Sequence, residues 1–347
     1  MASIPPREGE VVYEEYPVTL PLPIVPARCE MRIGEHRNHQ GLRLQTFRFQ
    51  KKPTKGYRGP KGIVNLCHGY GGHTQWEWFL PANPGETHDV YDGSLLDQLV
   101  DAGYVVITLD HQGHGRSEGA RGLRCFFESY DDLAIESSEF LRKEVGADPE
   151  LANLPIFLLG VSMGGCTAVK MSLLSPELYA GMVLLAPMLS LELVQEQIVA
   201  CCIRNKHLAP FAAFLSRQVP TLPIAAPARN EIHPLSQKEM DEDPYTYSGS
   251  ARARVAEQFL TTTQSLMGGE LRKVSVPFVT FHCKNDTFTD PAGSRALFDM
   301  ASTEDKTFLS VGIGQDVDED MWHALQFEPG RDAVAARALE WIGDHTR

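Results

Sequence analysis

The sequence predicts an α/β protein with a largely parallel central sheet that helices cover on both faces. Two observations carry this prediction. Short runs rich in Val, Ile, Leu and Phe recur along the chain, and a helix-like segment follows most of them. Nearly continuous apolar strands indicate burial on both faces of a sheet, which is typical of parallel strands. Their alternation with helices indicates the α/β class.

The expected strands and helices follow one another in a regular order. The first strand, residues 43–50, alternates polar and apolar residues as a half-exposed strand does. The later strands are nearly continuous apolar runs, at residues 62–67, 104–109, 155–159, 181–185, 277–281 and 307–311. Helices are expected at residues 93–102, 128–145, 163–174, 293–301 and 331–345.

One interval, between Leu189 and Lys273, interrupts this order because it contains no convincing strand. Apolar residues recur there at helical spacing, at Leu191, Val194, Ile198 and Cys202, before a Pro-rich stretch. We therefore expect a mostly helical cap inserted into one core. The predicted divisions are an N-terminal arm at 1–25, the first part of the core at 26–188, the cap at 189–273 and the second part of the core at 274–347.

Composition and charge narrow the function classes. The chain is 43% hydrophobic and 22% charged, as ordinary globular proteins are, and its formal charge of -13 argues against nucleic acid as a partner. No window is apolar enough for a membrane span, and the N-terminus lacks the pattern of a signal peptide. The seven cysteines are odd in number and contain no C-x-x-C pair, which indicates free thiols in a reducing compartment. We expect a cytoplasmic protein.

Two stretches match the G-x-S-x-G pattern of a serine nucleophile, one around Ser162 and one around Ser117. An activated serine must stand on a tight turn between a buried strand and a helix. Ser162 fits, because the strand at 155–159 precedes it, a helix follows it, and Gly160 and Gly164 flank the turn. Ser117 lies in a Gly-rich loop with no helix directly after it. We therefore assign the nucleophile to Ser162.

The acid and the base should follow the serine in that order, each in the loop after a later strand. Asp286 and Asp290 both follow the strand at 277–281; Asp286 is preferred because it lies nearer the strand end, whereas Asp290 precedes Pro291 as a helix N-cap would. Among the twelve histidines, His323 occupies the loop between the last strand and the last helix, and we expect it to be the base.

An oxyanion hole needs two backbone N–H groups. One is expected from Met163, the residue after the nucleophile, and the other from Tyr70, which follows His68 and Gly69 in the loop after an early strand. His68 is expected to orient or pack rather than act as a second base. His68, His111 and His114 fall at strand ends without a zinc-ligand spacing, so no metal site is predicted.

These motifs resemble the monoacylglycerol lipase branch of the α/β-hydrolase family, especially its plant-type monoglyceride lipases and caffeoylshikimate esterases. The resemblance rests on HGYGGHTQW, LDHQGHGRSEG, GVSMGG, DPYTYSG, the TDP of residues 285–291 and MWHAL, in that order from about Ile63 to Leu325. It implies an α/β-hydrolase fold with a helical cap over an acyl pocket, Asp286 as the acid, and Tyr70 and Met163 as oxyanion donors.

Two segments depart from the pattern of the family. Residues 81–94 are longer than the resemblance predicts, and residues 310–320 carry extra acidic residues ahead of His323. Because carboxylates near an imidazole favour its charged form, we expect this second segment to affect the pKa of His323.

The expected activity is hydrolysis of a lipid ester by a serine hydrolase, through an acyl-enzyme and without a cofactor. By resemblance, monoacylglycerol leads the substrate classes, followed by lysophospholipid and hydroxycinnamoyl esters, and the cap is expected to contact a lipid surface transiently. Three alternatives use the same scaffold: an acyltransferase, a non-catalytic ligand receptor, and a serine peptidase, for which Glu192 and Glu196 are the candidate residues that would bind a peptide amino terminus.

Overall fold

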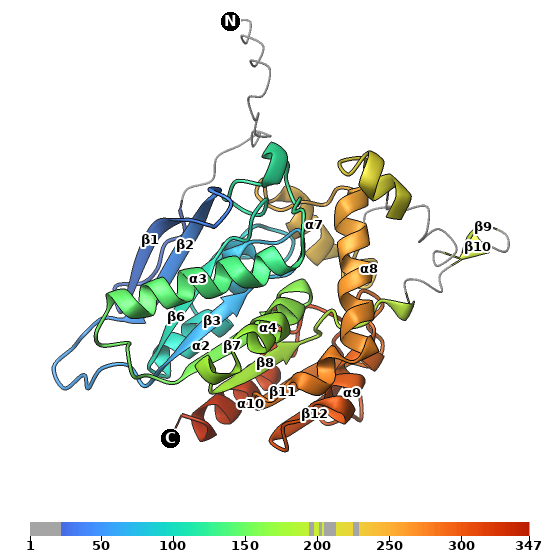
Figure 1. The fold of residues 1–347 in the computed structure, drawn as a ribbon. Coiled ribbons are helices and arrows are strands. Elements are labelled where there is room, and N and C mark those ends of the chain that lie inside the picture. Colours follow the sequence, from blue (N-terminus) through green and yellow to red (C-terminus); the bar gives the residue numbers. More distant parts are fainter. Residues whose placement is uncertain (1–21, 194–197, 201–202, 205–212, 225–228, 347) are drawn as a thin grey trace, which may run out of the picture.

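The computed structural model describes residues 22–193, 198–200, 203–204, 213–224 and 229–346. Figure 1 shows a central sheet with helices on both of its faces. Eight strands form the sheet in the order β1-β2-β6-β3-β7-β8-β11-β12. Their bounds are β1 Cys29–Arg37, β2 Arg43–Lys51, β3 Gly62–Cys67, β6 Tyr104–Leu109, β7 Ile156–Val161, β8 Gly181–Leu185, β11 Phe278–Cys283 and β12 Lys306–Val311.

The predicted parallel sheet is confirmed. β6, β3, β7, β8, β11 and β12 pair in parallel, while β2 pairs antiparallel with both β6 and the edge strand β1. The register opposes Cys67 to Gly160 at the ends of β3 and β7. The loops that leave these strands therefore begin side by side, at the carboxyl edge of the sheet where α/β proteins carry their sites.

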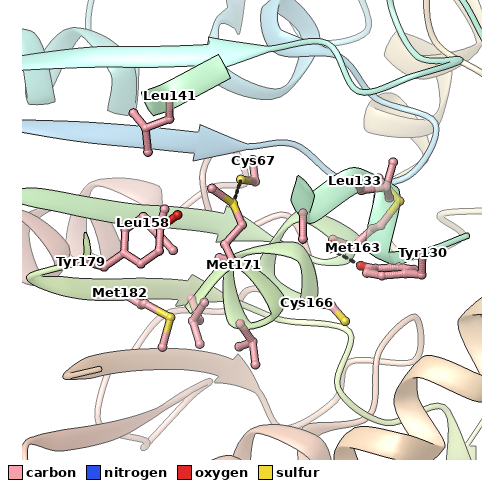
Figure 2. Packing of buried hydrophobic residues seen from close by; sticks show 14 of the residues in the cluster. Cys67, Tyr130, Leu133, Leu141, Leu158, Met163, Cys166, Met171, Tyr179 and Met182 are labelled. Carbon is pink, nitrogen blue, oxygen red and sulfur yellow. Dashed lines mark hydrogen bonds between the residues drawn. The ribbon is translucent and has the colours of Figure 1, made fainter. Parts of the chain in front are cut away.

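Helices sandwich this sheet. The main ones are α2 Leu95–Asp101, α3 Asp131–Ala147, α4 Met163–Leu174, α9 Pro291–Met300 and α10 Arg331–Asp344. Residues of α3 and α4 share one hydrophobic cluster, and residues of α2 and α10 share the other. Successive residues of β7 alternate between them, since Leu158 belongs to the first cluster and Leu159 to the second. Figure 2 shows Leu158 with Leu141 and Met171 in the first cluster.

Every predicted strand and helix of the core is present, with ends shifted by a few residues at most. The pattern did not predict β1, the short hairpin of β4 Leu80–Pro81 and β5 His88–Val90, or the one-turn helix α1 Thr74–Trp78. β1 pairs with β2 alone and carries half-exposed or exposed charged residues, including Glu30 and Arg32. An edge strand of this kind has no apolar run to reveal it.

The helical spacing expected at Leu191, Val194, Ile198 and Cys202 fails at Ile198: residues 192 and 193 are helical, but the backbone is extended at residue 198. Ile198 lies in β9 Ile198–Ala200, which pairs antiparallel with β10 Ile203–Arg204, while Val194 and Cys202 lie outside the described residues. The β-branched Ile198, Val199 and Ile203 favour an extended backbone over a helix.

The other described elements between β8 and β11 are helical: α7 Pro234–Glu242, α8 Ala253–Gly268 and the 3-10 turn η3 Glu270–Lys273. The proposed cap boundaries at residues 189 and 273 stay a prediction. Residues 1–21 of the predicted arm lie outside the described residues.

Two buried pairs tie α7 and the residue after it to the core. His88 Nε2 lies 3.2 Å from Glu239 Oε2, and His73 Nε2 lies 3.2 Å from Asp243 Oδ1. His88 belongs to the long segment at 81–94, which forms the β4–β5 hairpin. Tyr247 adds a backbone bond, its N–H donating to the Gly71 carbonyl at 2.8 Å. The inserted segment is therefore fixed to the loop after β3 and to the hairpin.

The cysteines that the structure describes are free and buried, at positions 29, 67, 125, 166 and 283. Cys201 and Cys202 lie outside the described residues. Within the described part of the chain, none of the helices is both long and apolar enough to span a bilayer.

Candidate active site

Ser162 occupies the tight turn between β7 and α4. Its φ of 53° and ψ of -120° lie in a region that costs an L-residue about 1–3 kcal/mol. Neighbouring backbone holds the turn: Ser162 N–H donates to the Leu185 carbonyl at 3.0 Å, and its carbonyl accepts from Gly165 at 3.0 Å and Met188 at 2.9 Å. The side chain makes no capping hydrogen bond to α4 and is half-buried. Its hydroxyl is thus left for chemistry at the carboxyl edge of the sheet.

The glycines around Ser162 allow a very close approach of backbone segments. A Cβ built on Gly164 would lie 2.0 Å from the Cys67 carbonyl oxygen, and one on Gly160 would lie 2.3 Å from the Gly164 carbonyl oxygen. Both obstacles are backbone atoms and cannot rotate away. Glycine at these positions therefore lets α4 begin directly against the ends of β3 and β7.

We expect Gly164→Ala to lower the free energy of unfolding by about 2–3 kcal/mol, because the added methyl group overlaps the backbone of β3. The measurement is urea-induced unfolding. Gly146→Ala is the matched control: Gly146 lies in α3 with no atom within 4 Å of its built Cβ, so stability should hold or rise by up to about 1 kcal/mol. Equal losses in both variants would contradict the steric explanation.

Asp286 lies in the loop after β11 and is 2% exposed. Its Oδ1 accepts the N–H groups of Phe288 at 2.7 Å and Thr289 at 3.0 Å. Its Oδ2 accepts from the Thr289 hydroxyl at 3.0 Å and from His323 Nδ1 at 2.6 Å, and lies 3.3 Å from His282 Nε2. Burial alone would raise the pKa of Asp286, but the charge of His323 and the hydrogen bonds from His282 and His323 outweigh it and hold that pKa well below its usual range.

His323 lies in the loop between β12 and α10, and its backbone is held by one carboxylate. The buried Glu328 accepts the N–H groups of Trp322 at 2.7 Å, His323 at 3.1 Å and Ala324 at 2.9 Å. Because Nδ1–H of His323 donates to Asp286, the lone pair of the neutral ring is on Nε2. The ring is therefore in the tautomer that a general base requires.

The pKa of His323 is raised above its ordinary value. Burial opposes the charged ring, but the charge and hydrogen bond of Asp286, with the charges of Glu328 and Glu77, outweigh it. The rise in the pKa of His323 has the direction expected for an imidazole near carboxylates. The carboxylates that cause it are Asp286, Glu328 and Glu77, not those of the acidic segment at 310–320. In the acidic segment ahead of His323, Asp316 accepts from the N–H and hydroxyl of Ser310, and Asp318 accepts from the Gly314 N–H. These two carboxylates thus order their own loop.

Tyr70, in the loop after β3, and Met163, the first residue of α4, are the two expected oxyanion donors. Among the described residues, neither backbone N–H donates a hydrogen bond. The Gly69 carbonyl accepts from His68 Nδ1 at 2.8 Å, and His68 Nε2 accepts the His111 N–H at 2.9 Å. Because the carbonyl and N–H of a trans peptide point in opposite directions, His68 turns the Tyr70 N–H away from itself.

The His68 ring packs at a tilt against two further buried histidines. Its ring centroid lies 4.6 Å from that of His111 and 5.2 Å from that of His114. Burial lowers the pKa of His68 well below its ordinary value and that of His114 to about 3. Near neutral pH both rings are uncharged, which suits a packing and orienting role beneath the Tyr70 loop.

The two rejected candidates have clear structural roles. Ser117 is buried; its hydroxyl donates to the Asp110 carbonyl at 2.5 Å and accepts the Gln45 N–H at 2.8 Å. Asp290 caps α9, accepting the Ala292 N–H at 2.9 Å, as its position before Pro291 predicted. Both side chains are thus occupied by backbone partners.

Sequence reasoning missed three residues that hold the candidate acid Asp286 and the candidate base His323: His282, Thr289 and Glu328. Thr289 lies three positions after Asp286, within reach of a local turn, so its spacing was a usable signal. Glu328 likewise follows His323 by five positions. His282 gave no signal beyond its place at the end of β11.

Comparison with known proteins places these features in context. A family model described as "Serine aminopeptidase, S33" matches residues 84–330, which is well over half of the chain. The caffeoylshikimate esterase of Arabidopsis thaliana is 29% identical over 83% of this chain and 79% of its own length. The monoacylglycerol lipase of Mycolicibacterium smegmatis is 28% identical over 82% of this chain and 89% of its own.

Solved structures share the fold. A soluble variant of the monoglyceride lipase of Saccharomyces cerevisiae, in complex with a substrate analogue, superposes with a TM-score of 0.70 at 18% identity. The match covers 96% of this chain and 100% of that one.

Proposed function

The chain belongs to the serine aminopeptidase S33 family and has the α/β-hydrolase fold, and from that premise we propose that this serine hydrolase cleaves a carboxylic ester, with monoacylglycerol as its preferred substrate. The observation that carries the proposal is the strained turn at Ser162, whose side chain makes no capping hydrogen bond, while the backbone N–H groups of Tyr70 and Met163 have no partner among the described residues. A lipase and an esterase at 28–29% identity support the reaction class.

The proposed reaction uses three side chains. Nε2 of His323 takes the proton of the Ser162 hydroxyl while Oγ attacks the ester carbonyl carbon. The N–H groups of Tyr70 and Met163 hold the oxyanion, and Asp286 stabilises the imidazolium. His323 then gives the proton to the leaving alcohol, which leaves an acyl-enzyme. Water, deprotonated by His323, attacks the acyl carbonyl, and His323 then gives that proton to the leaving Ser162 Oγ as the free acid departs. Every proton moves between side chains, substrate and water, so the mechanism uses no cofactor.

A cap over the site would bind the acyl chain and meet the lipid surface. We propose this role for residues 189–273. In its described part, Phe214 is 57% exposed, and Val219 and Leu222 are more than two-fifths exposed. Exposed apolar side chains of this size suit contact with a lipid surface. A cytoplasmic protein that meets membranes transiently would fit this arrangement.

A peptidase is the second candidate, because the family description names an aminopeptidase. Such an enzyme needs a carboxylate to bind the amino terminus of the peptide. Glu192 is exposed, and Glu196 lies outside the described residues. The exposed Glu192 does not provide the buried carboxylate that such a site would use, and ester hydrolysis is the preferred proposal.

The test is a substrate panel: monoacylglycerols of medium and long acyl chains, a lysophospholipid, a hydroxycinnamoyl ester and an amino-acid anilide. We expect the best monoacylglycerol to exceed the others in kcat/KM by about tenfold or more, which is about 1.4 kcal/mol of transition-state binding. When an acceptor alcohol is added to the reaction with monoacylglycerol, the product should still be free fatty acid rather than a new ester of that alcohol. The anilide as best substrate would replace the proposal with a peptidase, and the hydroxycinnamoyl ester as best would refute the lipid preference.

A further inference from the structure

Glu77 is a buried carboxyl at the contact of two loops of the candidate site, and sequence analysis did not single it out. It lies in α1 and is 3% exposed. Its Oε2 accepts the Gly69 N–H at 2.8 Å, and its Oε1 accepts a hydrogen bond from Nε2 of Gln326. Glu77 and Gln326 are 249 positions apart in the sequence. One carboxyl therefore joins the loop after β3 to the loop before α10.

The two loops carry different parts of the proposed chemistry. Gly69 precedes Tyr70, the proposed oxyanion donor, and Gln326 follows His323, the proposed base, by three residues. A Cβ built on Gly69 would lie 3.2 Å from Glu77 Oε2 and 3.5 Å from Ser162 Cβ. The carboxyl and the nucleophile thus lie close to the same glycine. A displacement of Glu77 would move the Gly69–Tyr70 peptide relative to both Ser162 and His323.

We propose that Glu77 is a positioning residue that, with Gln326, fixes the oxyanion loop relative to the loop of the catalytic histidine. This inference rests on the proposed ester hydrolysis. His68 holds the carbonyl of the Gly69–Tyr70 peptide, and Glu77 holds the N–H of the peptide before it. Adjacent peptides held in this way leave the Tyr70 N–H little freedom to turn, so the donor is aimed before substrate arrives.

The charge of Glu77 also reaches the base. Burial raises the pKa of Glu77 to about 7, although the Gly69 N–H and the nearby His323 and His73 favour its ionised form. The carboxyls that raise the pKa of His323 are Asp286, Glu328 and Glu77. Loss of the Glu77 charge should therefore lower the pKa of His323.

Gln326 suits a partner that titrates near neutral pH. A carboxamide can donate from its nitrogen to a carboxylate or, turned over, accept from a carboxylic acid. The Gln326 Oε1 is buried and has no hydrogen-bond partner among the described residues. The contact can thus persist in both protonation states of Glu77.

The experiment compares Glu77→Ala, Glu77→Gln and Gln326→Ala, with a soluble p-nitrophenyl ester that the wild type turns over in a Ser162-dependent manner. For Glu77→Ala and Gln326→Ala we expect kcat to fall about ten- to a hundredfold while KM changes less than about twofold, because the lost contact acts on the oxyanion hole. Glu77→Gln keeps an acceptor for the Gly69 N–H and should restore most of kcat.

The pH profile separates positioning from general damage to the fold. In Glu77→Gln the acid limb of kcat against pH should move to lower pH by about half a unit to one unit, since a negative charge near His323 is gone. Asp97→Asn is the matched control: this buried carboxylate of α2 accepts the Gly93 N–H at 2.9 Å and pairs with Arg28. It should leave kcat and the acid limb unchanged.

Two results would overturn the proposal: an unchanged kcat in a folded Glu77→Ala, or an acid limb in Glu77→Gln that coincides with that of the wild type. Should Glu77→Ala fail to fold, the Glu77→Gln profile decides alone. Failure of the proposed function is a separate result, because it would appear as ester turnover that survives Ser162→Ala. The substrate preference does not enter the test.

Discussion

Ser162→Ala is expected to abolish labelling by a fluorophosphonate probe and to lower ester turnover by up to about a millionfold. The hydroxyl is the proposed covalent attachment point, and the backbone turn that holds it depends on contacts of main-chain atoms that alanine keeps. The fold should therefore persist. The measurements are labelling of the purified protein and hydrolysis of monoacylglycerol, with circular dichroism to verify the fold.

Ser117→Ala is the matched control, because Ser117 centres the second G-x-S-x-G stretch. Its hydroxyl bonds only backbone groups in the described structure, so its loss should cost about 1 kcal/mol of stability and leave labelling intact. Labelling that survives in Ser162→Ala and disappears in Ser117→Ala would reverse the assignment of the nucleophile.

Asp286→Asn is expected to lower kcat about 10⁴-fold with little change in KM, an estimate taken from the corresponding change in a serine protease triad. Asparagine keeps the size of the side chain but loses the charge that stabilises the imidazolium, and its amide can hold His323 in the wrong tautomer. The second consequence concerns pH. Since the Asp286 charge raises the pKa of His323, the acid limb of the residual activity should move to lower pH.

Asp290→Asn provides the comparison for the neighbouring carboxylate. Asparagine caps helices about as well as aspartate does, so this variant should match the wild type in kcat and in unfolding. Steady-state kinetics of Asp286→Asn and Asp290→Asn at several pH values show which of the two carboxylates is the acid. If Asp290→Asn were the inactive variant, the acid would have to be reassigned.

The positions of the core strands along the chain could be predicted from the sequence, and the candidate site residues could be proposed from it, because both follow local patterns. Buried parallel strands leave continuous apolar runs, and a turn such as that at Ser162 is marked by glycines on both sides. The edge strand β1 has no such run because one side of it meets solvent. The expected helix around Ile198 failed because apolar spacing cannot distinguish a short β-branched strand from a helical turn.

The contacts that hold the site together were less predictable. Thr289 and Glu328 lie within five positions of their partners Asp286 and His323. Glu77 and Gln326, in contrast, are 249 positions apart and come into contact only in the folded protein. A buried glutamate in a one-turn helix has no periodic signature. Its meaning depends on which loop the fold brings against it.

The parallel pairing of β8 with β11 determines when the site can form during synthesis. Domains begin to fold on the ribosome from the N-terminal side, so Ser162 and the loop after β3 emerge first. β11 and β12 can join the sheet only after the intervening segment has been made, so the loops that carry Asp286 and His323 follow Ser162 in synthesis. A nascent chain that has not yet reached β11 therefore carries the proposed nucleophile without its proposed acid and base, and we expect such a chain to show no hydrolytic activity.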